Sequence, residues 1–468
     1  MKIYNSLTKS KEEFRPQSKG KVKMYACGVT VYDDCHIGHA RSLYIFEVIR
    51  RYLKYRGFKV KFIRNITDID DKIIKRANEL GANWRDLVDK YIKSYYKDLI
   101  ALGLSKADKE PRATENIKDM IKYIGKLIKK DYAYVSDSGV YFSVRKLKDY
   151  GKLSGQKIAD MQNNVRVEVD ESKKDQLDFA LWKISKDDEP SWPSPWGKGR
   201  PGWHIECSVM SQKYLKTDTL DIHGGGRDLI FPHHENEAAQ SEALSDKPFA
   251  NYWIHHGLLT INAQKMAKSL GNFVTIQEVL NKYPADVLKL FYLQAHYSSS
   301  IDFSWDKMAE VKKAYERLVI LKDKLEKNYR AVNIDKKFRP GAGSMADFKQ
   351  RFVEAMDDDF NMPKALAVLF DLVNECNKTI DGDRELKNFI LKYASGTIKE
   401  MTDIFCLGFF REKLEEVSET QINEKIKLRL EYKRNKNFAE ADRIRKELEE
   451  KGVILEDTKE GTAWRKAL

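Results

Sequence analysis

Residues 21–66, KVKMYACGVTVYDDCHIGHARSLYIFEVIRRYLKYRGFKVKFIRNI, contain the pattern that decides the fold of this 468-residue chain. The apolar run over 21–31 predicts a strand, and a second strand is predicted over 58–66. The segment 38–56 between them predicts a helix, because apolar residues recur there at helical spacing: Leu43, Phe46, Ile49 and Leu53. Gly57 follows where a helix C-cap belongs. A strand, a helix and a strand in this order indicate a parallel βαβ unit, and hence a doubly wound parallel-sheet α/β core with its ligand site at the carboxyl ends of the strands.

The pattern changes at about residue 113. A hairpin is predicted over 132–144, and the stretch 190–197 is punctuated by Pro and Gly. Strand and loop motifs typical of the core resume at Gly202 and continue to about Asp306. We therefore interpret 113–200 as a domain inserted into the core.

The last third of the chain predicts helices. One apolar stripe follows Asp306: Val311, Ala314, Leu318, Leu321 and Leu325. The polar stretch 335–344 is a predicted linker, and Pro363 suits the first turn of a helix that runs to about residue 379. The final unit, 419–468, predicts two charged helices broken near Asn437 and then a short Gly-containing ending.

The composition is that of a globular protein with a positive charge. Hydrophobic residues make up 42% and charged residues 33%, which excludes the disordered class. The net charge of +13 fits a polyanionic partner, and it fits an ordinary lysine-rich protein equally well. Five scattered cysteines exclude a disulfide framework and favour a reducing compartment. Because no segment is long and apolar enough to be a signal peptide or to span a bilayer, we expect a cytoplasmic protein without a membrane partner.

Two short motifs carry groups that suit phosphate. Residues 36–39 (HIGH) fall between the first strand and the first helix, where backbone N–H groups and the positive helix end attract anions. The two imidazoles can donate hydrogen bonds to a triphosphate, and Gly38 lets the backbone approach a flat base; a structural histidine pair in a turn is the alternative. Residues 265–269 (KMAKS) form either a solvated basic turn or a loop that brings two ammonium groups onto a departing pyrophosphate. Together the motifs predict an enzyme that uses ATP to activate a small carboxylic acid.

Four residues have the chemistry of metal ligands. Cys27 ends the first strand, Cys207 lies further along the core, and His233 and Glu237 are four residues apart on one face of a predicted helix. Two thiolates, an imidazole and a carboxylate can satisfy Zn²⁺, whereas a lone buried cysteine is usually a small hydrophobe. Because no CxxC spacing is present, the spacing leaves both interpretations open.

Three further carboxylates, Asp68, Asp70 and Asp71, resemble a Mg²⁺ site at first sight. We favour a solvated helix start, because carboxylates stabilise the positive end of a helix.

The two phosphate motifs resemble the ATP signatures of class I aminoacyl-tRNA synthetases. Five further stretches resemble the cysteinyl-tRNA synthetase family: residues 24–33, 65–72, 199–207, 221–226 and 231–237. The resemblance extends to 354–360 and so covers almost the whole chain. It implies a monomeric ligase, with one Zn²⁺ per subunit, that forms cysteinyl-adenylate from L-cysteine and Mg-ATP and then charges tRNA(Cys). Zinc would select the substrate thiolate, since a soft thiolate binds it better than an alcohol does.

The resemblance also implies a role for each matching residue. The implied catalytic residues are His36, His39, Lys265 and Lys268, and the implied ATP contacts are His36, Gly38, His39 and Lys268. The implied zinc ligands are Cys27, Cys207, His233 and Glu237, and the implied cysteine pocket consists of Thr67, Trp203, His223 and Asp228. Ala267 departs from the family pattern, which has Ser there; because both lysines of the motif remain, we expect activity to persist.

The implied architecture is a Rossmann-type catalytic core with an inserted connective domain, then an α-helical bundle and a small C-terminal anticodon-binding domain. The core would comprise 1–112 and 201–254, and the insert, which would receive the tRNA acceptor end, 113–200. The region carrying the 265–269 loop and contacting the tRNA stem would span 255–310, the bundle 311–410 and the anticodon domain 419–468. The implied anticodon contacts are Lys433, Phe438, Asp442 and Asp457. The two aspartates also suit a helix end or a turn.

Two other functions fit parts of this pattern. A related enzyme that ligates cysteine to an amino-sugar pseudodisaccharide would share the zinc and phosphate motifs, but the unit 419–468 argues against it. A catalytically silent RNA-binding paralogue is disfavoured by the intact His36, His39, Lys265 and Lys268.

Overall fold

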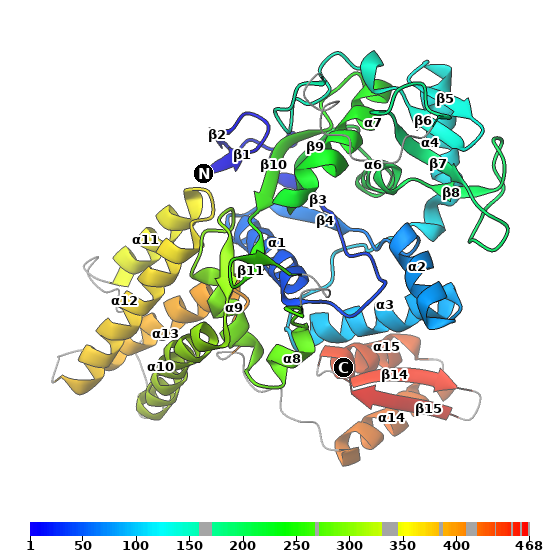
Figure 1. Ribbon diagram of the computed structural model, residues 1–468. Helices are drawn as coiled ribbons and strands as arrows, with labels where there is room; N and C mark the ends of the chain where they lie inside the picture. The colour runs from blue at the N-terminus through cyan, green and yellow to red at the C-terminus, as the bar shows by residue number, and fades with distance from the viewer. Residues whose placement is uncertain are drawn as a thin grey trace. The chain divides into compact units, whose positions relative to one another are not determined.

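The computed structural model describes residues 1–158, 171–266, 271–329, 345–382, 387–408, 419–435, 437–450, 453–458 and 461–466. These residues form two compact units, Met1–Leu407 and Gly408–Leu468, which are described separately below. Figure 1 labels most of the helices and strands of both units.

A four-stranded parallel sheet forms the centre of the first unit. Its order is β10 (Ala250–His256), β9 (Leu220–Gly226), β3 (Lys21–Ala26) and β4 (Lys59–Arg64). The predicted βαβ unit is confirmed, because β3 and β4 pair in parallel and α1 (Ile37–Tyr55) connects them. Strand β3 ends earlier than expected. Beyond it the chain lies so close to the end of β4 that a Cβ on Gly28 would stand 1.6 Å from the Asn65 carbonyl oxygen.

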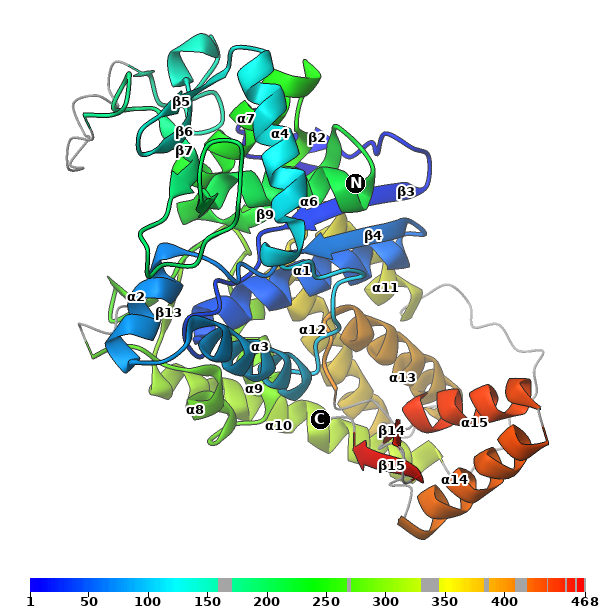
Figure 2. The ribbon, with the colours of Figure 1, turned by 90° about the vertical axis from the view of Figure 1, so that its right-hand side faces the viewer.

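The predicted apolar stripe of α1 is its buried face. Leu43, Phe46, Ile49 and Leu53 are all buried. The helix stops at Arg56, and Gly57 follows with a φ of +88°, which glycine adopts without strain. Helix α1 covers one face of the sheet, while α6 (Trp203–Leu215) and α7 (Glu235–Ser245) cover the other, as Figures 1 and 2 show. The sheet is therefore buried on both faces, as doubly wound folds require.

The inserted segment builds a second, antiparallel sheet. Its order is β5 (Ala133–Ser136), β6 (Gly139–Phe142), β7 (Phe179–Ile184) and β8 (Gly199–Pro201). The predicted hairpin is β5–β6, and α4 (Ile117–Lys129) precedes it. The insert shares one continuous hydrophobic core with the sheet side of α6: Ile124, Phe142, Trp182, Ile205 and Cys207 belong to the same cluster.

A small sheet next to α1 carries Lys265. Its order is β12 (Gln264–Lys265), β11 (Leu259–Ile261) and β13 (Ile301–Phe303), with β11 antiparallel to β12 and parallel to β13. Two short helices, α8 (Ile276–Leu280) and α9 (Ala285–Leu293), lie between β12 and β13 in the chain. At the N-terminus, β1 (Lys2–Asn5) and β2 (Ser10–Glu13) form a hairpin, and α2 (Asp71–Leu80) and α3 (Trp84–Ala101) follow β4.

Four helices complete the first unit: α10 (Trp305–Tyr329), α11 (Met345–Asp357), α12 (Met362–Asp381) and α13 (Lys387–Ile404). The expected stripe of α10 is buried at Val311, Leu318, Leu321 and Leu325, and Ala314 is half-buried. Pro363 stands in the first turn of α12 as predicted. The predicted linker 335–344 lies outside the described residues.

The second unit has a small core of its own. Helices α14 (Glu419–Arg434) and α15 (Phe438–Glu450) precede a hairpin of β14 (Val453–Thr458) and β15 (Gly461–Lys466). Ile422, Ile444, Leu448 and Leu455 form the core that joins the helices to the hairpin. The break between the two predicted helices is confirmed, and the expected short ending is a regular two-stranded ladder.

Candidate functional site

A cavity of about 600 Å³ opens at the carboxyl ends of the parallel strands. Its lining includes most of the residues predicted to act on substrate: Cys27, His36, Gly38, His39, Trp203, Asp228 and Lys265. Tyr32, Lys72, Met266 and Phe273 also line it. The chain therefore brings thiol, imidazole, carboxylate and ammonium groups to one space.

His36 and His39 lie at the N-terminus of α1, and hydrogen bonds there fix their rings. His36 is the N-cap residue, and its Nδ1 accepts hydrogen bonds from the backbone N–H groups of Gly38 (3.0 Å) and His39 (3.2 Å). His39 returns the contact, because its Nδ1 accepts from the His36 N–H at 3.3 Å. The two rings stack with centroids 3.7 Å apart. This is a capping box built from imidazoles, and it leaves each Nε2 to carry the proton.

Burial keeps both imidazoles neutral. It lowers the pKa of His36 to about 4, with small opposing effects from its own backbone and Asp228. The pKa of His39 also lies well below its ordinary value, first because of burial and then because a charge on this ring would be repelled by His36, when protonated, and by the Lys72 ammonium. Two neutral N–H donors at a helix N-terminus are suited to a phosphate oxygen.

Position 38 must be glycine for a steric reason within the same turn. A Cβ at this position would stand 2.8 Å from His36 Cε1 and 2.9 Å from His36 Nδ1. The ring that caps the helix thus requires glycine two residues later. Lys265 ends β12 with an exposed side chain at the cavity. The positions 267–270, including Lys268 and Ala267, lie outside the described residues.

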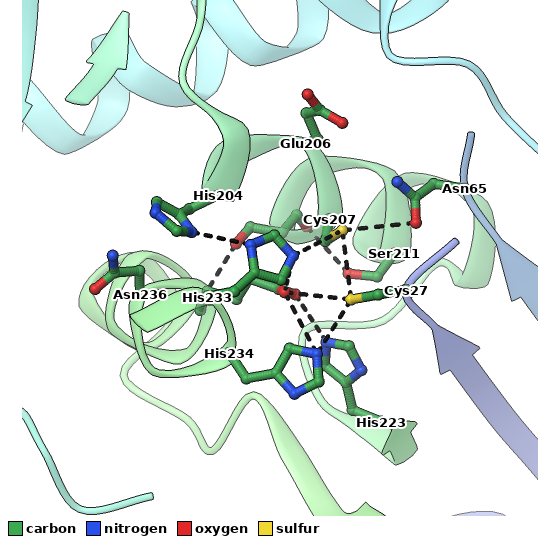
Figure 3. A network of polar contacts seen from close by, with 12 residues as sticks. Cys27, Asn65, His204, Glu206, Cys207, Ser211, His223, His233, His234 and Asn236 are labelled. Carbon is green, nitrogen blue, oxygen red and sulfur yellow. Dashed lines mark hydrogen bonds and ion pairs between the residues drawn. The ribbon is translucent and has the colours of Figure 1, made fainter. Parts of the chain in front are cut away.

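The four predicted metal ligands converge. Figure 3 shows three of them, Cys27, Cys207 and His233, pointing toward one another. One atom each of Cys27, Cys207, His233 and Glu237 lies within 4.8 Å of all the others. The Cys27 and Cys207 sulfurs are 3.8 Å apart, and Cys207 Sγ is 3.7 Å from His233 Nε2. His233 lies in the turn Ile230–His234, and α7, which contains Glu237, follows that turn directly. The spacing of four therefore places His233 Nε2 2.9 Å from Glu237 Oε1.

A second set of donors overlaps the first, with His223 and His234 in place of Cys207 and His233. Glu237 contacts members of both sets, and its Oε1 also lies 3.9 Å from His234 Nε2. Its Oε1 faces His233 and lies 3.5 Å from Cys27 Sγ, while its Oε2 is bonded to His223 Nε2 at 2.7 Å. His223 therefore orients the carboxylate from behind, as an outer partner of a ligand does.

The side chains of the cluster have pKa values that differ strongly from their ordinary values. Burial raises the pKa of Glu237, but His223 and His233 outweigh it and hold the net pKa well below the ordinary value. Burial lowers the pKa of His233, yet Glu237 and Cys207 raise it to about 10. Burial and the nearby Cys207 and Glu237 raise the pKa of Cys27. A cation replacing these protons would meet one carboxylate, one imidazole and two sulfurs in a buried place, a donor set that fits zinc.

The four predicted cysteine-pocket residues have different surroundings. Trp203 stacks on the His233 ring with centroids 4.0 Å apart and lines the cavity, and exposed Asp228 lines it too. Thr67 and His223 are buried and do not line it. Thr67 Oγ1 donates to Glu206 Oε2 at 2.7 Å, and His223 holds Glu237.

Several residues that the motifs did not single out surround the metal ligands. His204 Nδ1 lies 3.0 Å from His233 Nδ1, and His234 Nε2 lies 3.1 Å from Cys27 Sγ. His255 contacts His234 Nδ1 at 2.8 Å, and Asn65 Oδ1 accepts from the Gly28 N–H at 2.9 Å. His204 and His234 could have been suspected from the sequence, because each is next to a predicted site residue in the chain. Nothing in the sequence pointed to His255.

The predicted anticodon residues lie on the second unit. Phe438 begins α15 with 60% of its side chain exposed, and Asp442 is exposed on the same helix. Lys433 lies in the last turn of α14 and is half-buried. Asp457 belongs to β14.

The expectation of a solvated acidic helix start holds for two of the three carboxylates. Asp70 caps α2 by accepting from the Lys72 N–H at 2.9 Å, and Asp71 is exposed. Asp68 is different, because it is buried and accepts from the Thr114 N–H (2.9 Å) and Oγ1 (2.6 Å). Of the helices in the described ranges, none combines the length and the apolarity needed to cross a membrane.

Solved structures share this fold at low sequence identity. A methionyl-tRNA synthetase from Mycobacterium tuberculosis in complex with methionyl-adenylate superimposes with a TM-score of 0.65 at 14% identity, covering 82% of this chain and 90% of its own. A LeuRS–tRNA–LeuAMS complex from Agrobacterium radiobacter gives 0.66 at 10% identity, covering 85% of this chain and 86% of its own. The likeness establishes a class I synthetase fold.

Sequence comparisons identify the family. The profile described as the class I (C) tRNA synthetase catalytic domain matches residues 13–313, and the DALR domain profile matches 351–410. A cysteine–tRNA ligase from Thermodesulfovibrio yellowstonii is 49% identical over 99% of both chains. Another from Persephonella marina is 50% identical over 100% of this chain and 99% of its own. The chain therefore belongs to the cysteinyl-tRNA synthetase family of class I aminoacyl-tRNA synthetases.

Proposed function

We propose that this chain activates L-cysteine with ATP and transfers the cysteinyl group to the terminal adenosine of tRNA(Cys). The observation that carries the proposal is the single cavity shared by Cys27 of the donor cluster and by His36, His39 and Lys265. Groups that suit a thiol and groups that suit a triphosphate thus face the same space.

The first step would form cysteinyl-adenylate. A carboxylate oxygen of cysteine attacks the α-phosphorus of Mg-ATP, and the bond from that phosphorus to the bridging oxygen breaks, releasing pyrophosphate. The Nε2–H groups of His36 and His39 would donate to phosphate oxygens, and Lys265 and Lys268 would meet the charge that develops on the leaving pyrophosphate. In the second step a ribose hydroxyl of the tRNA attacks the carbonyl carbon and AMP leaves.

The donor cluster would hold zinc through Cys27, Cys207, His233 and Glu237. When bound, zinc supplies a soft Lewis acid that favours a thiolate over an alcohol. Packing alone discriminates such near-isosteres by only about 100-fold. His223 would keep Glu237 aligned, and Trp203 would cover His233 beside the substrate. Exposed Asp228 would meet the ammonium group of the substrate cysteine, and Thr67 would support the pocket through Glu206.

The domain roles extend this proposal. The segment 113–200 would receive the acceptor end, and 255–310 would contact the tRNA stem. The bundle 311–410 would connect these to the anticodon unit 419–468, where Lys433, Phe438, Asp442 and Asp457 are the proposed contacts. That unit is the specific observation against a cysteine–amino-sugar ligase, which has no anticodon to contact.

The function is tested by ATP–pyrophosphate exchange with purified protein and single amino acids. Exchange is expected with cysteine, and exchange with serine should be weaker by well over 100-fold, the limit that packing alone sets. No exchange with cysteine under conditions where the protein is folded and metal-loaded would contradict the proposed activity.

The metal ligands are tested by measuring bound zinc after purification. Cys207→Ser should lose both zinc and the preference for cysteine over serine. Cys376→Ser is the matched control, because Cys376 is a buried cysteine in α12 away from the cluster. Full zinc content in Cys207→Ser would show that the ligand set is different, with His223 and His234 as the next residues to replace.

A further inference from the structure

Arg41 is a buried cation whose partners are all backbone carbonyls. It lies on α1 two residues after His39, and its side chain has no solvent exposure. Nη1 donates to the carbonyl oxygens of Gly257 (2.8 Å) and Leu258 (2.9 Å). Nη2 donates to those of Tyr297 (3.3 Å) and Ser299 (2.5 Å). No carboxylate in the described part of the chain forms an ion pair with it.

The four carbonyls belong to the entrances of two strands. Gly257 and Leu258 lead from β10 directly into β11, and Tyr297 and Ser299 lie just before β13. Strands β11 and β13 are parallel neighbours, and β12, which ends at Lys265, pairs with β11. One guanidinium therefore ties the starts of β11 and β13, two of the three strands of the sheet that carries Lys265, to the helix that begins at the histidine pair.

The two segments meet at Gly257 with little room to spare. Its N–H donates to the Tyr297 carbonyl at 2.9 Å, and a Cβ there would stand 2.2 Å from the Ser299 oxygen. The four oxygens thus converge on one point. A planar group with several fixed donors satisfies them together, whereas a lysine ammonium has three donors and no fork.

Burying this charge is costly. Burial lowers the pKa of Arg41 to about 10, with only a small opposing effect from Tyr292. A buried charge is tolerated when hydrogen bonds satisfy it, yet Arg41 Nε has no partner among the described residues. Arg41 also lines the cavity that holds His36, His39 and Lys265. The Arg41 guanidinium thus lies at the same cavity as the His36–His39 pair and Lys265.

We infer that Arg41 is a positioning residue for adenylate formation, which holds the β11–β12 hairpin against α1 so that Lys265 and the His36–His39 pair face the same triphosphate. The inference rests on the proposed function. Its distinctive consequence is a difference between the two chemical steps. Pyrophosphate leaves in the first step only, so misplacing Lys265 slows adenylate formation and leaves transfer to tRNA unaffected.

The first test compares two conservative variants of α1. Arg41→Lys keeps the charge but cannot bridge both segments, and misplacement by about 1 Å is expected to reduce kcat for exchange by about 100-fold. Zinc content and the KM for cysteine should stay unchanged. Arg50→Lys is the matched control, since Arg50 is buried on the same helix but bonds Glu47 and the Lys106 carbonyl. It should exchange like the wild type.

The second measurement separates positioning from general stability. Cysteinyl-adenylate is formed on each enzyme, isolated in the complex, and chased with tRNA in a single turnover. Arg41→Lys should transfer cysteine to tRNA at the wild-type rate. If Arg41→Lys folds in low yield, Arg41→Gln replaces it and should show the same loss, confined to adenylate formation. Equal losses in both steps, or wild-type exchange in Arg41→Lys, would overturn the inference.

A double-mutant cycle links Arg41 to Lys265. If Arg41 acts by placing Lys265, the double variant Arg41→Lys/Lys265→Ala should lose no more exchange activity than Lys265→Ala alone. Multiplicative losses would overturn this role. If the proposed function is wrong, the result differs: the wild-type enzyme would exchange with another amino acid and not with cysteine. The exchange rates of the Arg41 variant and the wild type can then still be compared with that amino acid.

Discussion

His36 combines two roles in one ring. Its Nδ1 caps α1 by accepting from the N–H groups of Gly38 and His39, and its Nε2 is left to donate into the cavity. The cap fixes which nitrogen carries the proton, so the structural bond sets the tautomer that the proposed contact with ATP requires. His36 is thus placed both to cap the helix through Nδ1 and to donate through Nε2, and substitutions can separate these two roles.

Two substitutions of His36 should separate capping from catalysis. Asn is a good N-cap but has no donor in the place of Nε2, so His36→Asn should keep wild-type stability and lose about 100-fold in exchange kcat. His36→Ala should lose the same activity and about 1 kcal/mol of unfolding free energy as well. Urea denaturation and ATP–pyrophosphate exchange measure the two effects. Wild-type exchange in His36→Asn would show that the ring is only a cap.

The pH dependence of the same residue is a separate prediction. Burial lowers the pKa of His36 to about 4. The folded state therefore favours the neutral ring, and the stability contributed by keeping it neutral is complete above pH 6.5 and declines as pH falls toward 4. In exchange assays the ratio of wild type to His36→Asn should stay constant from pH 8 to 5.5. A ratio that changes with an apparent pKa near 6.5 would mean that His36 titrates like an exposed imidazole.

At the residue scale, the motifs located the four candidate ligands but not their surroundings. Cys27, Cys207, His233 and Glu237 were predicted from family resemblance, and the structure brings them together. The contact of His255 with His234 could not be predicted, because it depends on the parallel alignment of β10 with β9. Residue type and chain spacing carry no information about such a contact between distant elements.

At the scale of elements, the segment after β4 joins the core to the insert. Asp68 receives two hydrogen bonds from Thr114, at the start of the inserted region, while the exposed Asp71 pairs with Lys183 and with buried Arg200. Three neighbouring aspartates therefore have different roles. The sequence pattern grouped them because they share a helix start, and burial of the first depends on a segment about 46 residues away.

Replacing Asp68 should therefore cost more stability than replacing Asp71. Asp68→Asn places an amide where two donors converge and should lower the unfolding free energy by about 1–3 kcal/mol. Asp71→Asn, the control, removes ion pairs from a carboxylate that is 58% exposed and leaves Arg200 its pair with Glu189, so it should cost about 0–1 kcal/mol. Urea unfolding of both variants measures the difference. Equal costs would show that the bonds between Asp68 and Thr114 contribute no more than a surface pair.

Element types were easier to predict than element ends. Strand β3 and helix α1 follow from period and capping, since each is set by local residues. The end of β3 depends on the close approach of Gly28 to Asn65, and the C-terminal hairpin depends on packing of Val453 and Leu455 onto α14 and α15. Both are tertiary effects, which a one-dimensional pattern does not contain.

At the scale of the whole molecule, the chain forms two compact units, and the candidate catalytic groups belong to the first. The cavity and the donor cluster belong entirely to Met1–Leu407. The unit Gly408–Leu468 has its own hydrophobic core and exposes Phe438. An exposed aromatic beside basic residues suits stacking on an unpaired base. Activation and recognition of the anticodon should therefore be separable by cutting the chain between the units.

A variant truncated before Glu419 tests this division. Because the cavity and the four donors lie before the cut, zinc content and cysteine-dependent exchange should remain at wild-type levels. Charging should fall strongly, with the loss appearing as a raised KM for tRNA(Cys), since contacts to the anticodon would be gone. A tRNA with a changed anticodon is the matched control: the full chain should discriminate against it, and the truncated chain should charge both tRNAs equally poorly. Equal loss of exchange and charging would instead make 419–468 part of the catalytic fold.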